Sequence, residues 1–331
     1  MTEKSYRSSG SDVEVTSVGR IRSAIRSGPT TNSPLTLSSP ALRKPNDGAH
    51  RGTTPPRRSV RDLGKIAQQL SDRDWEVLRS VAEHRYLSVP HIRVLHFGEM
   101  PQASGLRTTQ RVLARLRRDR VLASLPARIG GHRSGSGATI HYVDEIGDRL
   151  LRQQAERRTR RPFREPTQRF LDHQLGIADA HVAFVEAAAV GQLELLRCEV
   201  EPASWRDYLG LGGARLTLKP DLYAEIASPP GSDNVDAAFI EIDRGTESIP
   251  TLLKKCREYE SYRRQGIEQD RSDGAFPLVI WSMTAPTHAR AERRRIALRE
   301  AIRRDRSLPD GLFVAIAPEQ LIQPLQKGTE S

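Results

Sequence analysis

Residues 218–245, LKPDLYAEIASPPGSDNVDAAFIEIDRG, hold two short apolar runs that each carry a carboxylate where a buried strand favours an aliphatic side chain. Short runs of this kind, separated by Pro, Gly and Ser, are typical of two strands joined by a turn. If the strands pair, Asp221 near the start of the first approaches Glu241 near the end of the second. Asp243 then lies on the face of Glu241, because side chains two apart on a strand share a face.

Three carboxylates in one place repel each other unless a cation lies between them. A divalent metal is the simplest such cation, and oxygen ligands alone favour Mg²⁺ or Mn²⁺ over zinc. We therefore expect Asp221 and Glu241 to be metal ligands for Mg²⁺. The open alternative is a metal-free salt bridge in which Arg244 neutralises Asp221 or Asp243.

The periodicity around these runs predicts a mixed sheet with helices packed on it. Helices are expected at residues 169–190, 247–266 and 289–305, and strands at residues 193–201, 218–226, 237–243, 276–283 and 311–317. In the last helix, the Arg293, Arg294 and Arg295 run is interpreted as a solvated face.

The preceding part of the chain predicts three helices and a hairpin. Ser71 and Ser88 are expected to cap the first two helices, with Pro90 in the first turn of the second. The third, in ASGLRTTQRVLARLRRDRVL, has Val112, Leu113 and Leu116 on its core stripe. Three helices followed by a basic hairpin form a winged helix, whose third helix enters the DNA major groove while its hairpin contacts phosphates. The candidate DNA-binding residues are Arg107, Thr108, Gln110, Arg111, Arg115, Arg128, His132 and Arg133.

The net charge of +11 over 331 residues favours a polyanionic partner, and the DNA-binding pattern points to double-stranded DNA rather than a membrane. The chain has no apolar run long enough to span a membrane and no apolar signal segment, so we expect a cytoplasmic protein. The predicted organisation is a disordered basic tail (1–65), a winged helix (66–150), a charged linker (151–167) and an α/β domain (168–325).

Pro220 and Asp221, followed by Glu241-Ile242-Asp243, resemble the motif of the PD-(D/E)XK nuclease-like fold. The resemblance implies that Asp221 and Glu241 hold Mg²⁺ and that the third position activates water. That position is usually Lys, whereas this chain has Asp243, so an ammonium would have to come from Lys254 or Lys255 in the following helix. Asp221, Glu241, Asp243 and Lys254 are thus the candidate catalytic residues. His173 is either a general base or a hydrogen-bonded surface histidine.

Taken together with HQLGIADAHVAF, EVEPASW and FIEIDRGTES, the chain resembles the replication-relaxation family of bacterial, largely actinobacterial, mobile elements. The resemblance implies an α+β or α/β protein with a winged helix and a nuclease-like domain. It also implies a role in plasmid or mobile-element replication, relaxation or mobilisation, with a plasmid replication or mobilisation complex as a partner. Three hypotheses stay open: an accessory DNA-binding protein, a Mg²⁺-dependent endonuclease or nickase, and a transcriptional regulator.

Overall fold

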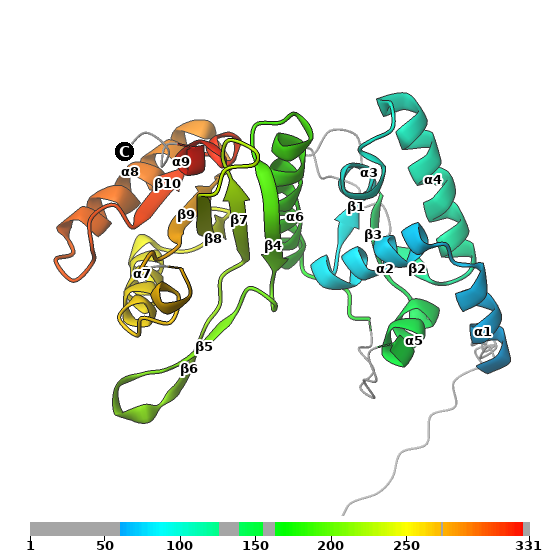
Figure 1. Ribbon diagram of the computed structural model, residues 1–331, viewed down its shortest axis with the longest axis horizontal. Coiled ribbons are helices and arrows are strands. Elements are labelled where there is room, and N and C mark those ends of the chain that lie inside the picture. Colours follow the sequence, from blue (N-terminus) through cyan, green and yellow to red (C-terminus); the bar gives the residue numbers. More distant parts are fainter. Residues whose placement is uncertain (1–59, 126–138, 155–162, 273, 327–331) are drawn as a thin grey trace, which may run out of the picture. The chain divides into compact units, whose positions relative to one another are not determined.

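The computed structural model describes residues 60–125, 139–154, 163–272 and 274–326, which belong to one compact unit spanning residues 57–331. Figure 1 shows that this unit contains a helical part followed along the chain by a five-stranded sheet. The predicted α+β class with a mixed sheet is confirmed. Both predicted domains, 66–150 and 168–325, lie within this unit.

The helical part follows the predicted order of elements. Helices α2 (Asp72–His84), α3 (Val89–Phe97) and α4 (Gln102–Arg118) are followed by strands β2 (Leu122–Ser124) and β3 (Ile140–Val143), which pair antiparallel. The short strand β1 (Leu87–Ser88) adds to β3, so the small sheet has the order β1-β3-β2. Ser71 and Ser88 cap α2 and α3 through capping boxes, as their hydroxyls satisfy free backbone N–H groups of the first turn.

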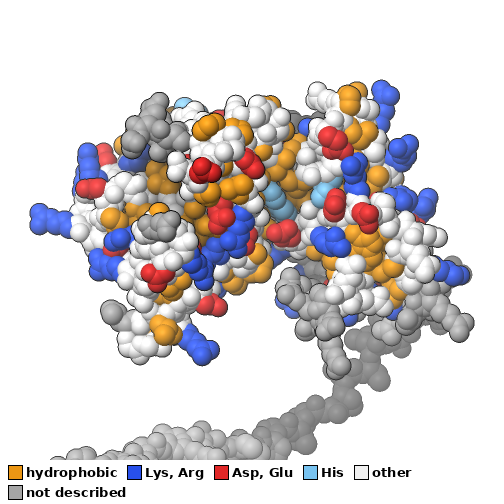
Figure 2. Space-filling model, in the orientation of Figure 1, with side chains coloured by type: hydrophobic (Ala, Val, Ile, Leu, Met, Phe, Trp, Pro, Cys, Tyr) orange, Lys and Arg blue, Asp and Glu red, His pale blue; other side chains and the backbone are white. Residues whose placement is uncertain are grey.

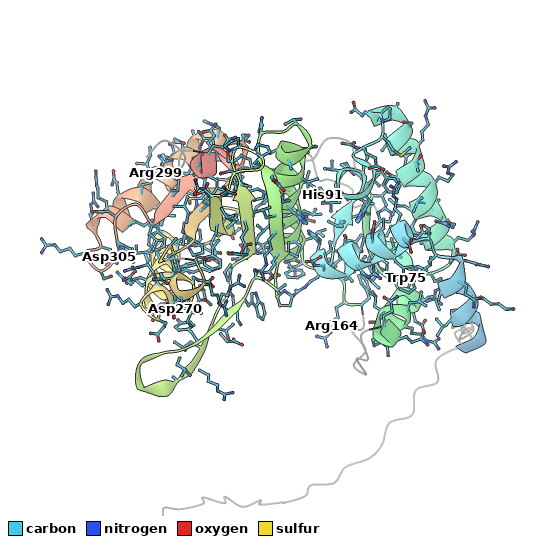
Figure 3. All side chains as sticks on the ribbon, viewed as in Figure 1. Trp75, His91, Arg164, Asp270, Arg299 and Asp305 are labelled. Carbon is cyan, nitrogen blue, oxygen red and sulfur yellow. The ribbon has the colours of Figure 1, made fainter. Side chains whose placement is uncertain are left out.

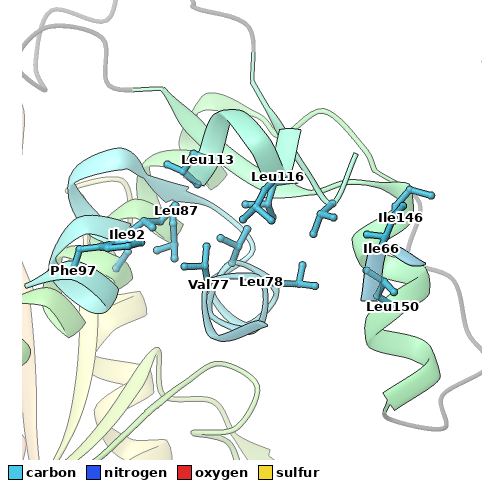
Figure 4. Packing of buried hydrophobic residues seen from close by; sticks show 14 of the residues in the cluster. Ile66, Val77, Leu78, Leu87, Ile92, Phe97, Leu113, Leu116, Ile146 and Leu150 are labelled. Carbon is cyan, nitrogen blue, oxygen red and sulfur yellow. The ribbon is translucent and has the colours of Figure 1, made fainter. Parts of the chain in front are cut away.

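One hydrophobic core holds these helices together (Figure 4). Leu113 and Leu116 of the predicted core stripe of α4 are 2% and 0% exposed. Apolar side chains spaced three to four residues apart on α2 and α4 meet because each helix buries one stripe. The labelled members are Ile66, Val77, Leu78, Leu87, Ile92, Phe97, Leu113, Leu116, Ile146 and Leu150.

Two further helices extend this part beyond its predicted limits. Helix α1 (Val60–Gln69) begins inside the segment predicted as a disordered tail, and α5 (Glu145–Gln154) runs into the predicted linker. Leu63 and Ile66 of α1 and Ile146 and Leu150 of α5 are buried in the same core. Each helix is only ten residues long and has an apolar stripe at helical spacing, but it borders a segment rich in Arg, Ser, Pro or other polar residues, so it was assigned to the tail or the linker. Residues 1–59 of the predicted tail and 155–162 of the predicted linker lie outside the described residues.

The larger sheet has the strand order β10-β9-β8-β7-β4. Strands β4 (Glu194–Val200), β7 (Leu222–Ala227) and β8 (Val235–Asp243) pair antiparallel, whereas β9 (Leu278–Met283) and β10 (Phe313–Ile316) continue the sheet in parallel with β8. The parallel connections pass through α7 (Ile249–Arg263) and α8 (His288–Arg304), as parallel strands require a crossover. All of these elements lie within a few residues of their predicted positions.

Helices cover both faces of this sheet. Ile177, Ala180 and Phe184 of α6 (Gln168–Ala189) pack on one face against Ile240. Tyr259 of α7 packs on the other face, against its neighbours on β8 and β10. Successive residues of β8 therefore point to opposite helices, and the face that carries Glu241 and Asp243 is the face of α7 and α8.

Several smaller elements complete the unit. Strands β5 (Arg206–Leu209) and β6 (Arg215–Leu218) form an antiparallel hairpin between β4 and β7, which the sequence did not predict. Tyr208 on β5 is buried against Tyr262 of α7, so it anchors the hairpin. Three 3₁₀ turns, Leu211–Gly213, Gln269–Arg271 and Pro318–Gln320, and the short helix α9 (Gln323–Gln326) occupy the remaining connections. No helix in the described ranges is long and apolar enough to cross a membrane.

Helix α6 also contacts the helical part through histidines. His84 Nδ1 lies 2.9 Å from the Ser80 carbonyl oxygen, so this nitrogen carries the hydrogen, and His84 Nε2 accepts a hydrogen bond from His181 Nδ1 at 3.0 Å. His91 Nε2 lies 2.8 Å from Asp179 Oδ1. Figure 3 shows His91 beside α6, and Figure 2 shows histidine side chains gathered in this region. Protonation of His84 at Nε2 would turn its acceptor into a second donor and break the pair.

This contact predicts an acid-sensitive stability. Burial lowers the pKa of His84 to about 3 and that of His181 to about 4, below the ordinary value of 6.5. Below pH 6.5 the unfolded chain therefore binds protons that the folded chain does not, so stability falls as the pH falls. Each histidine contributes up to about 1.4 kcal/mol per pH unit to this decline. Replacing both residues (His84→Gln, His181→Gln) should flatten the decline between pH 6.5 and 5, measured by denaturant unfolding.

The exposed His288 at the start of α8 supplies the control. His288→Gln should leave the pH dependence of unfolding as it is in the wild type. A double variant whose stability declines with the wild-type slope would contradict the buried, neutral histidine pair.

Candidate functional site

Asp221, Glu241 and Asp243 meet at one end of the large sheet, as the sequence predicts. Leu222 is paired with Ile240, which places Asp221, just before β7, across from Glu241 near the end of β8. Asp221 Oδ2 accepts a hydrogen bond of 2.7 Å from the backbone N–H of Ile242. The start of one strand and the end of its antiparallel neighbour thus bring carboxylates together that are far apart in the sequence.

Each of these carboxylates has its own cationic partner from a different helix. Lys255 of α7 pairs with Glu241, Arg294 of α8 pairs with Asp243 at 2.7 Å, and His173 of α6 lies 3.2 Å from Asp221. The Glu241 and Asp243 side chains are each 1% exposed. Buried carboxylates of this kind require charge partners and hydrogen-bond donors, because desolvation otherwise makes their ionised forms costly.

Helix α7 places two donors on Glu241. Ser248 caps this helix by accepting from the Thr251 N–H, which sets the helix start just after β8. Lys255 and Tyr259 are four residues apart and therefore share a helix face. Lys255 binds one oxygen of Glu241, and the Tyr259 hydroxyl donates to the other at 2.5 Å.

The three consecutive arginines of helix α8 lie in three different environments. Arg294 donates from Nε and Nη2 to Asp243 Oδ2 at 3.1 and 2.7 Å. Arg295 is buried, donates to the Met283 carbonyl and pairs with Glu292, whereas Arg293 is exposed. The sequence interpretation of a solvated face therefore holds only for Arg293, because successive residues of a helix point about 100° apart.

The pKa values of the site reflect burial and this pairing. Burial raises the pKa of Glu241 to about 7, although the Lys255 ammonium lowers it. Burial also acts to raise the pKa of Asp221, but the hydrogen bond from His173 and the charge of Lys255 outweigh it and hold the pKa below its usual value. Burial acts to lower the pKa of His173. The hydrogen bond to Asp221 and the negative charge of this residue act in the opposite direction, and the pKa of His173 is raised overall. The His173–Asp221 pair is thus held in its charged form.

Of the two lysines considered in the sequence, only Lys255 reaches the carboxylates. Lys254, the candidate catalytic residue, has a side chain that is 77% exposed and lies 3.9 Å from Glu258. The two lysines are adjacent on a helix, so their side chains point in different directions. The spacing from Glu241 in the sequence could not decide which of them faces the carboxylates. Arg244 likewise forms no ion pair with Asp221 or Asp243; His173 and Arg294 take that role. The sequence singled out His173 as a general base or a hydrogen-bonded surface histidine, whereas Arg294 was interpreted only as part of a solvated face, because its helix is distant in the chain.

The donor set does not fit a metal ion as the residues are arranged. Both oxygens of Glu241 bind Lys255 and Tyr259, and Asp243 is held by Arg294 and the Gly245 N–H. Within the described ranges, no group of three or more His, Cys, Asp or Glu side chains is placed to hold a metal. A Mg²⁺ ion at Asp221 and Glu241 would have to displace protein cations that already neutralise these carboxylates.

A pocket of about 330 Å³ opens over the carboxylates. Its wall comes from the start of α6, the β8–α7 connection and α7, so these three elements surround the end of the sheet. The lining residues are Thr167, Arg169, Phe170, His173, Asp221, Glu241, Ile242, Asp243, Arg244, Thr246, Glu247, Leu252, Lys255 and Trp281.

The predicted DNA-binding residues divide into three groups. Arg107, Gln110 and Arg111 are exposed on α4, and Thr108 is half-buried. Figure 2 shows Lys and Arg side chains along the edge where α4 lies in Figure 1. Arg115, whose side chain is 38% exposed, forms an ion pair of 2.5 Å with the buried Asp74 of α2. Arg117 and Arg118, not singled out in the sequence, are also exposed on this helix. Arg128, His132 and Arg133 lie outside the described residues.

The Glu241–Lys255 pair predicts a large loss of stability when its cation is removed. Lys255→Met should lower the free energy of unfolding by about 3–5 kcal/mol at pH 8, because Glu241 and Asp221 stay buried without it. The loss should shrink towards pH 6, since the folded variant keeps a proton on Glu241 that the unfolded chain releases as the pH rises. Denaturant unfolding at several pH values measures both effects.

Lys254→Met is the matched control, because it removes the same group one residue away at an exposed position. It should change stability by less than about 0.5 kcal/mol. Adding Glu241→Gln to Lys255→Met should recover part of the loss. Equal effects of the two lysine variants would contradict the pairing.

Comparison with known proteins adds one match. The family model described as replication-relaxation matches residues 78–279, which include the helices α3 and α4, Asp221 and the strands β7 and β8. No curated protein and no solved structure matches the chain. Since the match covers more than half of the chain, the protein belongs to the replication-relaxation family.

Proposed function

We propose that this protein is an accessory DNA-binding protein of a replication or relaxation process, one that binds duplex DNA through α4 and the β2–β3 hairpin. The family description ties the chain to replication or relaxation. The observation that carries DNA binding is the exposed basic face of α4, with Arg107 and Arg111 free of the ion pairs that hold Arg115. The finer role, in plasmid or mobile-element replication or mobilisation within a larger complex, is part of this proposal.

The arrangement of the helical part supports a winged-helix mode of binding. The order α2, β1, α3, α4, β2, β3 and the antiparallel pairing of its strands support the proposal of a winged helix. In this fold the third helix presents its outer face to the major groove, where an arginine binds a guanine edge through two hydrogen bonds. The Arg115–Asp74 pair fixes α4 against α2, so the remaining arginines project from a rigid support.

For the nuclease-like sheet, we propose a role in binding or assembly without metal-dependent cleavage. The support is the pairing of all three carboxylates with Lys255, Arg294 and His173. Asp243 also stands where nuclease-like sites usually have the lysine that activates water. The protein cations perform the neutralising role that a divalent ion performs in a metal-dependent site.

One observation favours a second candidate, a Mg²⁺-dependent endonuclease or nickase. Lys255 places an ammonium on Glu241 and within electrostatic reach of Asp221, although it comes from α7 and not from the strand position of Asp243. In this alternative Asp221 and Glu241 would hold the ion that lowers the pKa of bound water, and Lys255 would move towards that water. The two candidates differ in their response to added Mg²⁺.

The first test concerns α4. Arg107→Ala and Arg111→Ala should each weaken binding to a preferred duplex by roughly 1 to 3 kcal/mol in a gel-shift titration, because base-edge contacts are lost. Arg303→Ala on α8 removes an equally exposed arginine and should leave sequence preference unchanged. Arg115→Ala should mainly lower the melting temperature. Wild-type affinity in the Arg107→Ala, Arg111→Ala double variant would rule out α4 as the DNA-reading helix.

The second test separates the two candidates for the sheet. The protein is incubated with supercoiled plasmid while Mg²⁺ or Mn²⁺ is raised in 10-fold steps, and the plasmid should stay intact. The ions should also not raise the melting temperature of the protein, since Lys255 and His173 already neutralise the carboxylates. Asp221→Asn with Glu241→Gln provides the comparison. Nicking that requires Mg²⁺ and disappears in this double variant would establish the endonuclease and overturn the accessory role.

A further inference from the structure

The pocket over the carboxylates has its negative charges at the floor and its positive charges at the wall. The side chains of Asp221, Glu241 and Asp243 are 11%, 1% and 1% exposed. In contrast, the side chains of His173, Lys255 and Arg169 are 31%, 27% and 65% exposed. A solute that enters the pocket therefore meets cationic groups before it meets carboxylate oxygens, most of which already accept hydrogen bonds from the protein.

Arg244 is a further cationic residue of the pocket wall. It follows Asp243 at the end of β8 and lines this pocket, but it forms no ion pair in the part of the chain that the structure describes. Arg244 lies against α6 at Gly176, where a Cβ would lie 3.7 Å from Arg244 Cδ and 2.8 Å from Ile242 Cγ2. Arg244 Nη1 lies 3.9 Å from the same position, so the lack of a side chain at Gly176 lets β8 and the outer part of the Arg244 side chain approach the helix closely.

The acidic residue at the edge of the pocket, Glu247, forms only a weak ion pair. Glu247 precedes α7, its side chain is 46% exposed, and its nearest oxygen lies 3.8 Å from Arg169 Nη2. At this distance and exposure the pair contributes little, and an incoming anion can compete for Arg169. Arg169 and Arg244 are therefore two guanidinium groups on the same pocket that are available to an oxyanion.

From this arrangement we infer that the pocket binds a phosphate group of a nucleic-acid backbone through Arg244 and Arg169, without a metal ion. A guanidinium presents paired donors that match phosphate oxygens, which suits it to this ligand better than an ammonium. The volume of about 330 Å³ is at the lower end of the range for small-molecule sites, sufficient for a phosphate with an adjoining sugar. This inference rests on the proposed metal-free state of the site, and it adds the phosphate group as the ligand of that site.

The test measures binding by calorimetry in the presence of a metal chelator, with the full chain. The probes are inorganic phosphate, 5′-phosphorylated dithymidine and, as the phosphate-free comparison, thymidine. We expect the dinucleotide to bind more tightly than inorganic phosphate, and thymidine not to bind. Inorganic phosphate binding as tightly as the dinucleotide would overturn the assignment to a nucleic-acid backbone.

Three variants assign the binding to the named residues. Arg244→Gln should weaken dinucleotide binding by about tenfold or more, since a charge-assisted contact is lost, and Arg244→Lys should recover only part of it. Glu247→Gln should strengthen binding, because it removes the acid that competes for Arg169. Arg293→Gln, at an exposed site on α8, should match the wild type. Wild-type affinity in Arg244→Gln, or binding that appears only with Mg²⁺, would overturn the inference.

Failure of this inference and failure of the proposed DNA binding give different results. The Arg107→Ala, Arg111→Ala double variant should lose duplex affinity but keep dinucleotide binding, because α4 does not line the pocket. Duplex binding that persists while no variant at the pocket has an effect would overturn the pocket assignment alone. Dinucleotide binding without any duplex binding would overturn the proposed role of α4 alone.

Discussion

The need to neutralise three carboxylates at the end of β7 and β8 organises the sheet and its helices. Asp221, Glu241 and Asp243 lie too close together and too deep to remain ionised without partners. His173, Lys255 and Arg294 supply three positive charges, one each from α6, α7 and α8. The ion pairs therefore fix where each helix crosses the end of the sheet. A buried pair is not by itself strongly stabilising, but the loss of one partner is costly, so the three helices are bound to one arrangement.

Helix α6 connects this charged cluster with the helical part of the unit. His173 in its first half reaches Asp221, while Asp179 and His181 further along contact His91 of α3 and His84 of α2. Gly176 lies between these contacts and allows Ile242 to approach the helix. One helix thus carries both the contact to the candidate site and the contact to the elements that support α4. Movement of α6 would affect both, since its 22 residues form one continuous helix.

Much of the fold followed from local patterns in the chain. Ser71 and Ser88 mark helix starts, and the alternation in VDAAFIEID marks β8 and its two faces. The approach of Asp221 to Glu241 followed from two strands that had to pair antiparallel across a short turn. In contrast, α1 and α5 were missed although their apolar residues have helical spacing, because each helix is only ten residues long and borders a polar, Arg-rich segment. The β5–β6 hairpin was missed because it depends on Tyr208 packing against a helix more than 50 residues later.

The sequence by itself determined that three carboxylates would share one end of a mixed sheet and that an amphipathic, arginine-rich helix would follow two capped helices. Strand alternation, helical periodicity and capping are properties of neighbouring residues, so they can be read along the chain. Only the tertiary structure decided which cations meet those carboxylates: Lys255 and not Lys254, Arg294 from within an arginine run, and His173. It likewise paired Arg115 with the buried Asp74 and left Arg107 and Arg111 exposed. The physical reason is that a charge selects its partner by distance and burial, and both are set by how helices pack after their local structure has formed.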